Sequence, residues 1–371
     1  MSRSITAFSD NQNYEKAFEE VCLQIDSVGK TPKLIVFTSD VDVFWYYAEN
    51  IKKRYPEAIT IGSTTYMNIC NNSISKTGFA ALSVFSGIEC VAGAVFEIDH
   101  HPANYIRHIK EAVASLSVCT NTCCLEFSTA FSYAEELVLD TFDEVLSGMG
   151  IPLIGGTSGT KDGEDRSIVS LNGEIYKNTC VFVLIHNLNG RIALYKETLY
   201  KPSNKIFTAT EVDCEKRIVY EYDGKPAAEA LSQALGMNVE RFADNIKRYP
   251  VGRLIGDEVF LTEPNCVNKD NSIQYLAQIF NQTKVSLIDL DDVQKVWSTT
   301  KEETLAQVSN PSFAIVINCI ARTKLFETKE LLEPFEKQLR DSYKNFICLS
   351  GYGEQFDFIH LNLTMALAIF E

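Results

Sequence analysis

The sequence predicts an α/β protein in which strand-helix-strand-hairpin units repeat and form mixed sheets flanked by helices, in two domains. Short apolar runs alternate with segments of helical periodicity, which is typical of sheets with helices packed on their faces. The same order of elements occurs three times along the 371 residues. The segment Lys201-Pro-Ser-Asn-Lys205 is rich in loop-forming residues after a strand, so we place the domain junction there, between domains 1–200 and 206–371.

Each copy reads as an apolar strand with a polar end, a helix, a second apolar strand, a corner and a closing strand. The first copy is expected at 33–37 (strand), 41–54 (helix), 58–61 (strand), 62–66 (corner) and 77–85 (closing strand), after a helix over 11–28. The second copy is expected at 123–127, 133–148, 152–154 and 155–159, with a closing hairpin of 167–171 and 180–186 that turns at Asn172-Gly173. The third copy is expected at 313–317, 329–343, 346–354 and 360–364.

Charge and hydropathy exclude several classes of function. The formal net charge is -15, from 49 acidic and 34 basic residues, and no window combines Lys and Arg with aromatic residues. Nucleic acids and anionic membranes are therefore poor partners. No apolar run reaches the roughly 20 residues that span a bilayer, and the N-terminal residues lack the apolar segment of a signal peptide. We expect a cytoplasmic protein.

Cysteine and histidine spacing predicts neither a metal site nor a cofactor site. None of the 11 cysteines forms a Cys-x-x-Cys motif, and most lie in apolar runs, so we expect buried reduced thiols. The five histidines show no His-x-x-x-His spacing. The corner of the second copy, at residues 156–161, lacks the Walker pattern and is followed by a strand, so no helix N-terminus is available for a phosphate.

The third copy carries the best binding-site signal, because unlike polar groups follow or interrupt its buried strands. Arg322 follows the 313–317 strand, where α/β sheets place ligands, and could grip a carboxylate. Glu354 follows a glycine corner and could hold an ammonium group. Together they would form an amino-acid pocket; the alternatives are an Arg322–Glu354 bridge and a surface ion pair with Glu327.

The strand expected over 360–364 would project three polar side chains from one face. If that face is buried it can orient a ligand, and if not it is a solvated outer face. The expected ligand-binding residues are Ser63, Thr64, Gly155, Gly156, Cys319, Arg322, Gly351, Tyr352, Gly353, Glu354, His360, Asn362 and Thr364.

Two further functions remain open at this point. Cys319 as nucleophile with His360 as base would make a cysteine-dependent hydrolase, although no sequence feature activates the thiol. A protein-interaction scaffold without a ligand is the other alternative. We expect no enzyme activity and no catalytic residue.

Three C-terminal motifs resemble a known family. Asn318-Cys-Ile-Ala-Arg322, Gly351-Tyr-Gly-Glu354 and His360-Leu-Asn362-Leu-Thr364 are similar to the C-terminal FIST domain, which carries a Cys-x-x-Arg, a Gly-Tyr-Gly-Glu-like corner and a His-Asn-x-Thr strand. The segment 222–227 resembles the entry of that domain. Ile61-Gly-Ser-Thr64 and Leu153-Ile-Gly-Gly156 resemble the N-terminal FIST domain.

The resemblance implies an intracellular sensory module of signal transduction that binds a small polar metabolite such as an amino acid. No output domain accompanies the two FIST-like domains in this chain, so the resemblance implies a stand-alone form that signals through a partner, such as a kinase or another transducer. The first corner departs from the family pattern: Ser63-Thr-Thr-Tyr-Met67 stands where the family has Ser-Thr-Ala-Gly-Glu. A ligand role for that corner is therefore in doubt.

Overall fold

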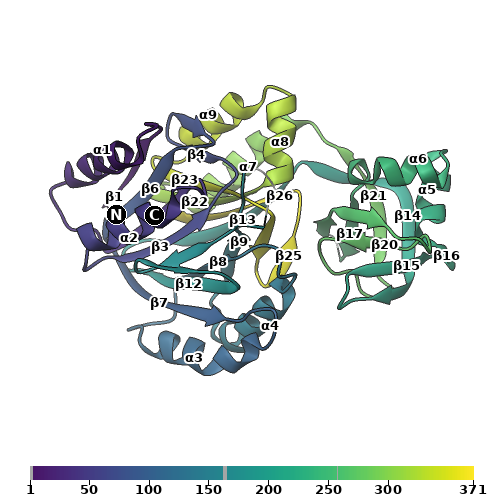
Figure 1. The fold of residues 1–371 in the computed structure, drawn as a ribbon, viewed down its shortest axis with the longest axis horizontal. Coiled ribbons are helices and arrows are strands. Elements are labelled where there is room, and N and C mark those ends of the chain that lie inside the picture. Colours follow the sequence, from purple (N-terminus) through teal and green to yellow (C-terminus); the bar gives the residue numbers. More distant parts are fainter. Residues whose placement is uncertain (1–2, 162–164, 257) are drawn as a thin grey trace. The chain divides into compact units, whose positions relative to one another are not determined.

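The computed structural model describes residues 3–161, 165–256 and 258–371, and these form two compact units (Figure 1). The larger, which we call the three-sheet unit, comprises Met1–Glu197, Trp297–Ile359 and Met365–Glu371. The smaller, which we call the inserted unit, comprises Thr198–Val296 and His360–Thr364. The chain enters the inserted unit twice, and each unit has its own core.

The three-sheet unit contains three copies of one order of elements: strand, helix, strand, helix, strand, hairpin, strand. The first copy consists of β1 (Arg3–Ser9), α1 (Tyr14–Asp26), β2 (Leu34–Ser39), α2 (Phe44–Arg54), β3 (Ile59–Thr64), β4 (Asn68–Cys70), β5 (Ser73–Ser75) and β6 (Phe79–Ser86). The second consists of β7 (Ile88–Phe96), η1 (Pro102–Tyr105), α3 (Ile106–Ala114), β8 (Thr122–Ser128), α4 (Glu135–Leu146), η2 (Ser147–Met149), β9 (Leu153–Thr157), β10 (Val169–Leu171), β11 (Glu174–Tyr176) and β12 (Thr179–Asn187). The third consists of β13 (Ile192–Thr198), α7 (Val293–Gln307), β22 (Phe313–Cys319), α8 (Ile320–Thr328), α9 (Leu332–Ser342), β23 (Phe346–Gly351), β24 (Gly353–Phe356), β25 (Ile359–Leu361) and β26 (Thr364–Phe370).

The copies exchange hairpins in a cycle. The sheet orders are β1-β6-β2-β3-β10-β11, β7-β12-β8-β9-β24-β25 and β13-β26-β22-β23-β4-β5. Each sheet therefore takes four strands from one copy and a two-stranded hairpin from another. Because the first copy completes the sheet of the third, no copy has a complete sheet of its own.

The burial pattern explains why these segments become strands and helices. All residues of β2, β8, β22 and β23 are buried, as expected for strands covered on both faces. The inward faces of the three sheets contribute to one shared core that includes Val36, Leu125 and Ile317. Helices α1 and α2 bury their apolar stripes on the outer face of the first sheet, and α3 and α4 do so on the second.

A ring of three backbone hydrogen bonds links the corners that follow β3, β9 and β23. Tyr66 N donates to Ser350 O at 2.9 Å, and Gly159 N donates to Thr64 O at 3.0 Å. Tyr352 N closes the ring by donating to Thr157 O at 2.9 Å. Each copy thus donates to one neighbour and accepts from the other, so Tyr66, Gly159 and Tyr352 occupy equivalent positions.

The inserted unit lies in the chain between β13 and α7 and is built mainly of antiparallel strands. Its elements are β14 (Tyr200–Asp213), β15 (Ile218–Tyr222), β16 (Lys225–Pro226), α5 (Ala227–Leu235), α6 (Val239–Asp244), η3 (Ile246–Arg248), β17 (Val251–Ile255), β18 (Glu258–Thr262), β19 (Pro264–Val267), β20 (Ile273–Tyr275) and β21 (Lys284–Leu290). Its core includes Tyr222 and Tyr275, whose hydroxyl groups are hydrogen-bonded at 2.8 Å.

The fold class predicted from the sequence is confirmed: strand-helix-strand-hairpin units repeat and form mixed sheets flanked by helices. The predicted junction at residues 201–205 lies within strand β14 and not in a loop. The compact units are also divided differently, because the inserted unit begins at Thr198 and the chain returns to the three-sheet unit at Trp297. The split into domains 1–200 and 206–371 stays a prediction.

Three local predictions were wrong. The expected hairpin partner of residues 167–171 is the short β11 and not residues 180–186, which lie in β12 of another sheet. Arg322 lies in an unpredicted helix, α8, because the chain turns directly from β22 into a helix at Ile320. The strand expected over 360–364 is interrupted, because Leu363 adopts a φ of 62° between β25 and β26.

Within the described part of the chain, no helix is both long and apolar enough to cross a membrane.

The corner ring generates a first prediction. A Cβ atom on Gly159 would lie 2.2 Å from Ser350 O and 2.8 Å from Tyr66 N, both of them backbone atoms of the ring. We expect Gly159→Ala to lower the free energy of unfolding by about 1–3 kcal/mol, since overpacking forces the backbone to move. Denaturant unfolding measures this change. The control is Gly148→Ala, because a Cβ atom at Gly148 would meet no atom within 4 Å. This substitution should change the free energy of unfolding by less than about 0.5–1 kcal/mol. Equal effects of the two substitutions would contradict the proposed importance of the ring.

Candidate functional site

The three corners lie at the carboxyl ends of parallel strand pairs, which are the usual places for ligands in α/β sheets. At the centre the polar groups satisfy one another. Ser63 Oγ is 2.8 Å from Ser158 Oγ, and Ser158 Oγ donates to Ser128 O at 3.0 Å. Thr64 contributes its carbonyl to the ring. The predicted residues Ser63 and Thr64 therefore hold the corners together in this structure.

The surroundings of the three equivalent corner residues differ. Tyr66 donates a hydrogen bond of 2.6 Å from its hydroxyl to Glu327, and Lys76 Nζ lies 2.9 Å from the same hydroxyl. Tyr352 Oη is 2.8 Å from Thr160 Oγ1. The third position is Gly159, so no tyrosine ring lies there, and a group of charged side chains is found instead.

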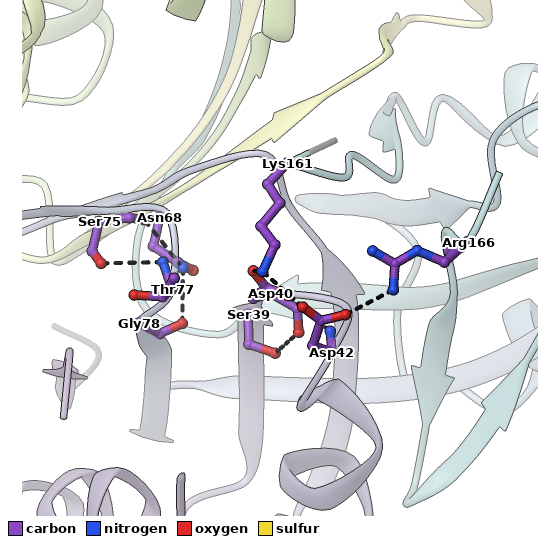
Figure 2. A network of polar contacts seen from close by, with 9 residues as sticks. All are labelled: Ser39, Asp40, Asp42, Asn68, Ser75, Thr77, Gly78, Lys161 and Arg166. Carbon is purple, nitrogen blue, oxygen red and sulfur yellow. Dashed lines mark hydrogen bonds and ion pairs between the residues drawn. The ribbon is translucent and has the colours of Figure 1, made fainter. Parts of the chain in front are cut away.

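We call these side chains the strand-end quartet: Asp40, Asp42, Lys161 and Arg166 (Figure 2). Lys161 Nζ lies 2.7 Å from Asp40 Oδ2 and 2.7 Å from Asp42 Oδ2. Arg166 Nη1 lies 2.7 Å from Asp42 Oδ1. Asp40 and Asp42 follow β2, and Lys161 and Arg166 follow β9. The quartet therefore connects the segments that follow strands of two different copies.

Electrostatics favour the charged forms of Asp42 and Lys161. Hydrogen bonds from Lys161 and Arg166 hold the pKa of Asp42 below its usual value, and hydrogen bonds to Asp40 and Asp42 raise the pKa of Lys161. The Asp40 side chain is only 3% exposed, whereas those of Asp42, Lys161 and Arg166 are 49%, 33% and 40% exposed. Three members of the quartet are accessible to a ligand.

Two aromatic side chains are linked to Thr160, the residue before Lys161, through the hydrogen bond of Tyr352. The ring of Phe131 makes an edge contact with the ring of Tyr352, with 5.1 Å between centroids. Phe131 and Tyr133 have φ values of 66° and 54°, which is uncommon for bulky residues, and both are exposed. Such backbone conformations concentrate at functional sites.

Arg322, the predicted carboxylate-binding residue, lies elsewhere and is fully buried. Its Nη2 lies 2.5 Å from Glu197 Oε1, and Thr300 Oγ1 donates to Glu197 Oε2 at 2.6 Å. The guanidinium group also lies over the Phe326 ring, 5.5 Å from its centroid. The ion pair is with Glu197 and not with Glu327, which binds Lys76 and Tyr66 instead.

The structure does not bring Arg322 and Glu354 together. Glu354 in β24 is opposite Gly156 in β9, so the two residues share a face. A Cβ atom on Gly156 would lie 2.5 Å from Ile317 and 3.0 Å from Leu349, on the core-facing side of β22 and β23. Arg322 belongs to the helix-covered side, with Glu197 and Phe326. Arg322 and Glu354 therefore do not face each other across an amino-acid pocket.

The predicted glycines allow close approach of strands. A Cβ atom on Gly351 would lie 2.2 Å from Thr157 O, and one on Gly155 would lie 2.2 Å from Glu126 Oε1. Gly353 is opposite Thr157 in the β24–β9 pair. Gly351 and Gly156 thus allow close contact between the second and third copies, whereas Gly155 makes room for Glu126 within the second copy.

The remaining predicted residues are divided between the units. Cys319, at 1% exposure, ends β22 of the three-sheet unit. His360, Asn362 and Thr364 belong to the inserted unit, where Arg253 Nη2 donates to His360 O at 3.0 Å and Glu263 N donates to Asn362 Oδ1 at 3.3 Å. A ligand role for any of the predicted residues stays a prediction.

Sequence reasoning missed the quartet and also Glu126. The polar end at Asp40 was visible, but nothing in the sequence showed that Lys161 and Arg166 reach it. Glu126 lies inside the apolar strand β8 and is fully buried, with Ser128 Oγ at 2.7 Å and Cys180 Sγ at 3.1 Å from its Oε2. Desolvation raises the pKa of Glu126 to about 7. A charged residue within an apolar strand was the signal that could have identified it.

No group of three or more His, Cys, Asp or Glu side chains in the described ranges is arranged to hold a metal ion.

The buried Arg322–Glu197 pair generates a stability prediction. Removing one partner leaves the other charge buried, so we expect Glu197→Ala to cost roughly 3–5 kcal/mol of unfolding free energy. Chemical denaturation of the full chain measures the loss. The control is Glu303→Ala, an exposed carboxylate that binds Tyr195 Oη at 2.7 Å and should contribute less than about 1 kcal/mol. A loss as small as that of the control would show that the pair is not structural.

Glu126 generates a prediction about pH. Its folded-state pKa of about 7 lies above the ordinary value of 4.5 for a glutamate, so the folded protein binds more protons than the unfolded chain between these values. Protonated Glu126 therefore contributes to the stability of the folded protein below about pH 4.5. That contribution is lost as the pH rises to about 7, a change of about 3 kcal/mol at 1.36 kcal/mol per pKa unit. Glu126→Gln should remove that component of the pH dependence of unfolding.

A suitable comparison is Glu89→Gln. Hydrogen bonds from Ser117 lower the pKa of Glu89, so its effect on the pH dependence should have the opposite sign. Parallel stability curves for the wild type and Glu126→Gln from pH 4.5 to 7 would contradict the assignment.

Comparisons with known proteins place the chain in a family. The FIST N domain matches residues 34–225, and the FIST C domain matches residues 227–357. An uncharacterized protein of Methanocaldococcus jannaschii is 24% identical over 226 residues, which is 56% of this chain but only 43% of that protein. A solved structure of a cyanuric acid hydrolase covers the full length of both chains at 8% identity, with a TM-score of 0.35, a likeness too weak to support an inference. The family matches cover most of the sequence, and the chain belongs to the FIST family.

Proposed function

We propose that this protein is a sensory module that binds a small polar metabolite at the strand-end quartet and signals through a partner protein. FIST domains are sensory domains. The observation that carries the proposal is the quartet itself, in which two carboxylates and two cations meet at the carboxyl ends of β2 and β9. Aromatic side chains lie nearby, on Phe131 and Tyr352.

The chemistry of the quartet fits a ligand that carries both charges, such as an amino acid. Arg166 and Lys161 can bind a ligand carboxylate, and the guanidinium group can do so through two parallel hydrogen bonds. Asp42, at 49% side-chain exposure, can accept hydrogen bonds from a ligand ammonium group. Since the four charges cancel, the ligand would exchange one set of ion pairs for another without leaving an unpaired charge.

The quartet replaces the Arg322–Glu354 pair as our proposed centre for an amino acid. A ligand at Arg322 would have to displace Glu197 from a fully buried ion pair, and separating such a pair is strongly unfavourable. The quartet is partly exposed, so its ion pairs are weaker and easier to exchange. Tyr352 belongs both to the ligand-binding residues expected from the sequence and to this proposed site.

We place the protein in the cytoplasm and its output in a separate protein, such as a kinase or another transducer. Both follow from the sensory role of FIST domains. The net charge of -15 favours partners that are not nucleic acids. Ligand exchange at the quartet would alter the positions of the partly exposed side chains of Asp42, Lys161 and Arg166, which a partner could recognise.

The structure lowers support for a cysteine hydrolase. The Cys319 thiol is enclosed at 1% exposure, and Cys319 and His360 belong to different compact units. A nucleophile must reach its substrate, and reactive cysteines are usually accessible. A scaffold without a ligand remains the outcome if no metabolite binds.

A thermal-shift screen of amino acids and related metabolites tests the proposal. A ligand at 100 times its Kd adds about 2.7 kcal/mol, which corresponds to a rise in Tm of roughly 5–10 °C for a chain of this size. Calorimetric titration of Arg166→Met should then show at least about a tenfold loss of affinity, because a charge-assisted hydrogen bond is worth about 1.5–3 kcal/mol.

The matched control is Arg107→Met. Arg107 is also an arginine in an exposed ion pair, with Glu111 at 2.8 Å on α3, but it lies outside the quartet. It should leave affinity unchanged. If no compound raises Tm, the sensing proposal fails; if Arg166→Met and Arg107→Met bind a confirmed ligand equally well, the site lies elsewhere.

A further inference from the structure

The edge strand β7 has a free side along most of its length. It is the last strand of its sheet and, within the described part of the chain, pairs with β12 alone. Leu188 N donates to Gly87 O, so the pair Gly87–Leu188 is a hydrogen-bonded one. Pairs alternate along an antiparallel ladder. Val91, Gly93 and Val95 therefore bond to β12, while Cys90, Ala92, Ala94 and Phe96 direct their N–H and C=O groups away from the sheet.

Lys33 provides an independent check of this orientation. Its Nζ donates to Ile88 O at 3.2 Å, which requires the carbonyl of Ile88 to point away from β12. Ile88 is two and four residues from Cys90 and Ala92, so the backbone groups of all three point to the same side of the strand. Among the described residues, no side chain forms a hydrogen bond with the backbone of 90–96.

Two hollows adjoin this edge strand. One, of about 410 Å³, is lined by Val91, Gly93, Phe182 and residues of α3 such as His108. The other, of about 630 Å³, is lined by Ile88, Cys90 and residues such as Ile59 and Leu188. Side chains of an added strand would alternate between the two faces.

The equivalent edge strands carry protecting groups, whereas among the described residues β7 has such a bond only at its first residue, where Lys33 bonds Ile88 O. In β1, Gln24 bonds both the N–H and the C=O of Phe8, at 3.1 and 2.8 Å, and Asn345 Nδ2 donates to Ser4 O at 3.3 Å. Strand β13 carries the charges of Lys196 and Glu197. Within 90–96 the sequence Cys-Val-Ala-Gly-Ala-Val-Phe has no charge and no proline. Natural edge strands usually have such devices because a bare edge pairs with other chains.

The sequence of β7 favours pairing with itself. Val91-Ala-Gly-Ala-Val95 reads the same in both directions. In an antiparallel pair of two copies related by a twofold axis at Gly93, Ala92 is opposite Ala94 and Val91 is opposite Val95. Cys90 is then opposite Phe96, so the residues with free backbone groups are opposite one another. This register satisfies the alternation of the ladder and places no charge opposite a like charge within 90–96.

We propose that the protein forms a symmetric dimer in which β7 of one copy pairs antiparallel with β7 of a second copy around Gly93. The two six-stranded sheets become one continuous sheet. The palindromic sequence selects a second copy as the occupant, because a twofold axis requires the same surface on both partners. This proposal is independent of ligand binding at the quartet.

Analytical ultracentrifugation of the full chain tests the dimer. In a concentration series that reaches roughly 100 µM, the 41.6-kDa chain should be seen to sediment as a dimer. Ala92→Pro removes an N–H that faces away from β12, so the sheet keeps its own hydrogen bonds but the edge is blocked. We expect the dimer Kd to rise at least tenfold.

The matched control is Thr6→Pro in β1. Phe8 directs its backbone groups away from β6, and Thr6 has the same parity, so this proline also removes an outward N–H from an edge strand. It should leave the dimer intact. A wild-type monomer over the whole range, or an unchanged dimer in Ala92→Pro, would overturn the proposal.

Hydrogen exchange of the wild type gives a test without substitution, should the proline variant not fold. The amides of Ala92 and Ala94 should exchange more slowly as protein concentration rises, while that of Thr6 should not change. Concentration-independent exchange at Ala92 and Ala94 would show that β7 is not the interface.

Discussion

The ring of hydrogen bonds among Tyr66, Gly159 and Tyr352 is the constraint on which the three-sheet unit depends. Each bond joins two copies, and the hairpin that follows each corner completes a sheet of another copy. If one corner moves, the hairpin beyond it loses its register with the neighbouring sheet. The close approaches at Gly159 and Gly351 have the same origin, because a side chain there would separate backbones that must touch. Closure of the ring therefore determines both the fold and the position of the polar strand ends.

The threefold arrangement also explains why only one corner became the candidate site. Equivalent positions carry tyrosine, glycine and tyrosine, and the two rings make contacts that close their corners. At Gly159 the corresponding region contains partly exposed charges. A repeat supplies three similar frameworks, and differences at single positions decide which of them is accessible.

The sequence predicted the repeat well, since apolar runs, helical periodicity and corners are local signals. It could not predict that β4–β5, β10–β11 and β24–β25 pair with sheets of other copies, because exchange of hairpins leaves no local mark. The site shows the same limit. The sequence predicted that Arg322 could bind a ligand, but Glu197, 125 residues away along the chain, forms an ion pair with it. Lys161 and Asp40 belong to different copies, so their contact depends on closure of the ring, which no spacing within one segment reveals.

The exchange of hairpins has a consequence for how the chain reaches its native state during synthesis. Strand β4 pairs with β23, which lies near the opposite end of the sequence. The first copy therefore emerges from the ribosome with a hairpin that has no partner until nearly the whole chain has been made. Pairings between distant segments form slowly and leave strand edges exposed in the meantime. Strand β23 is translated long after the first copy and provides the partner of β4, so a chain truncated before β23 would present the unpaired β4–β5 hairpin to chaperones and proteases.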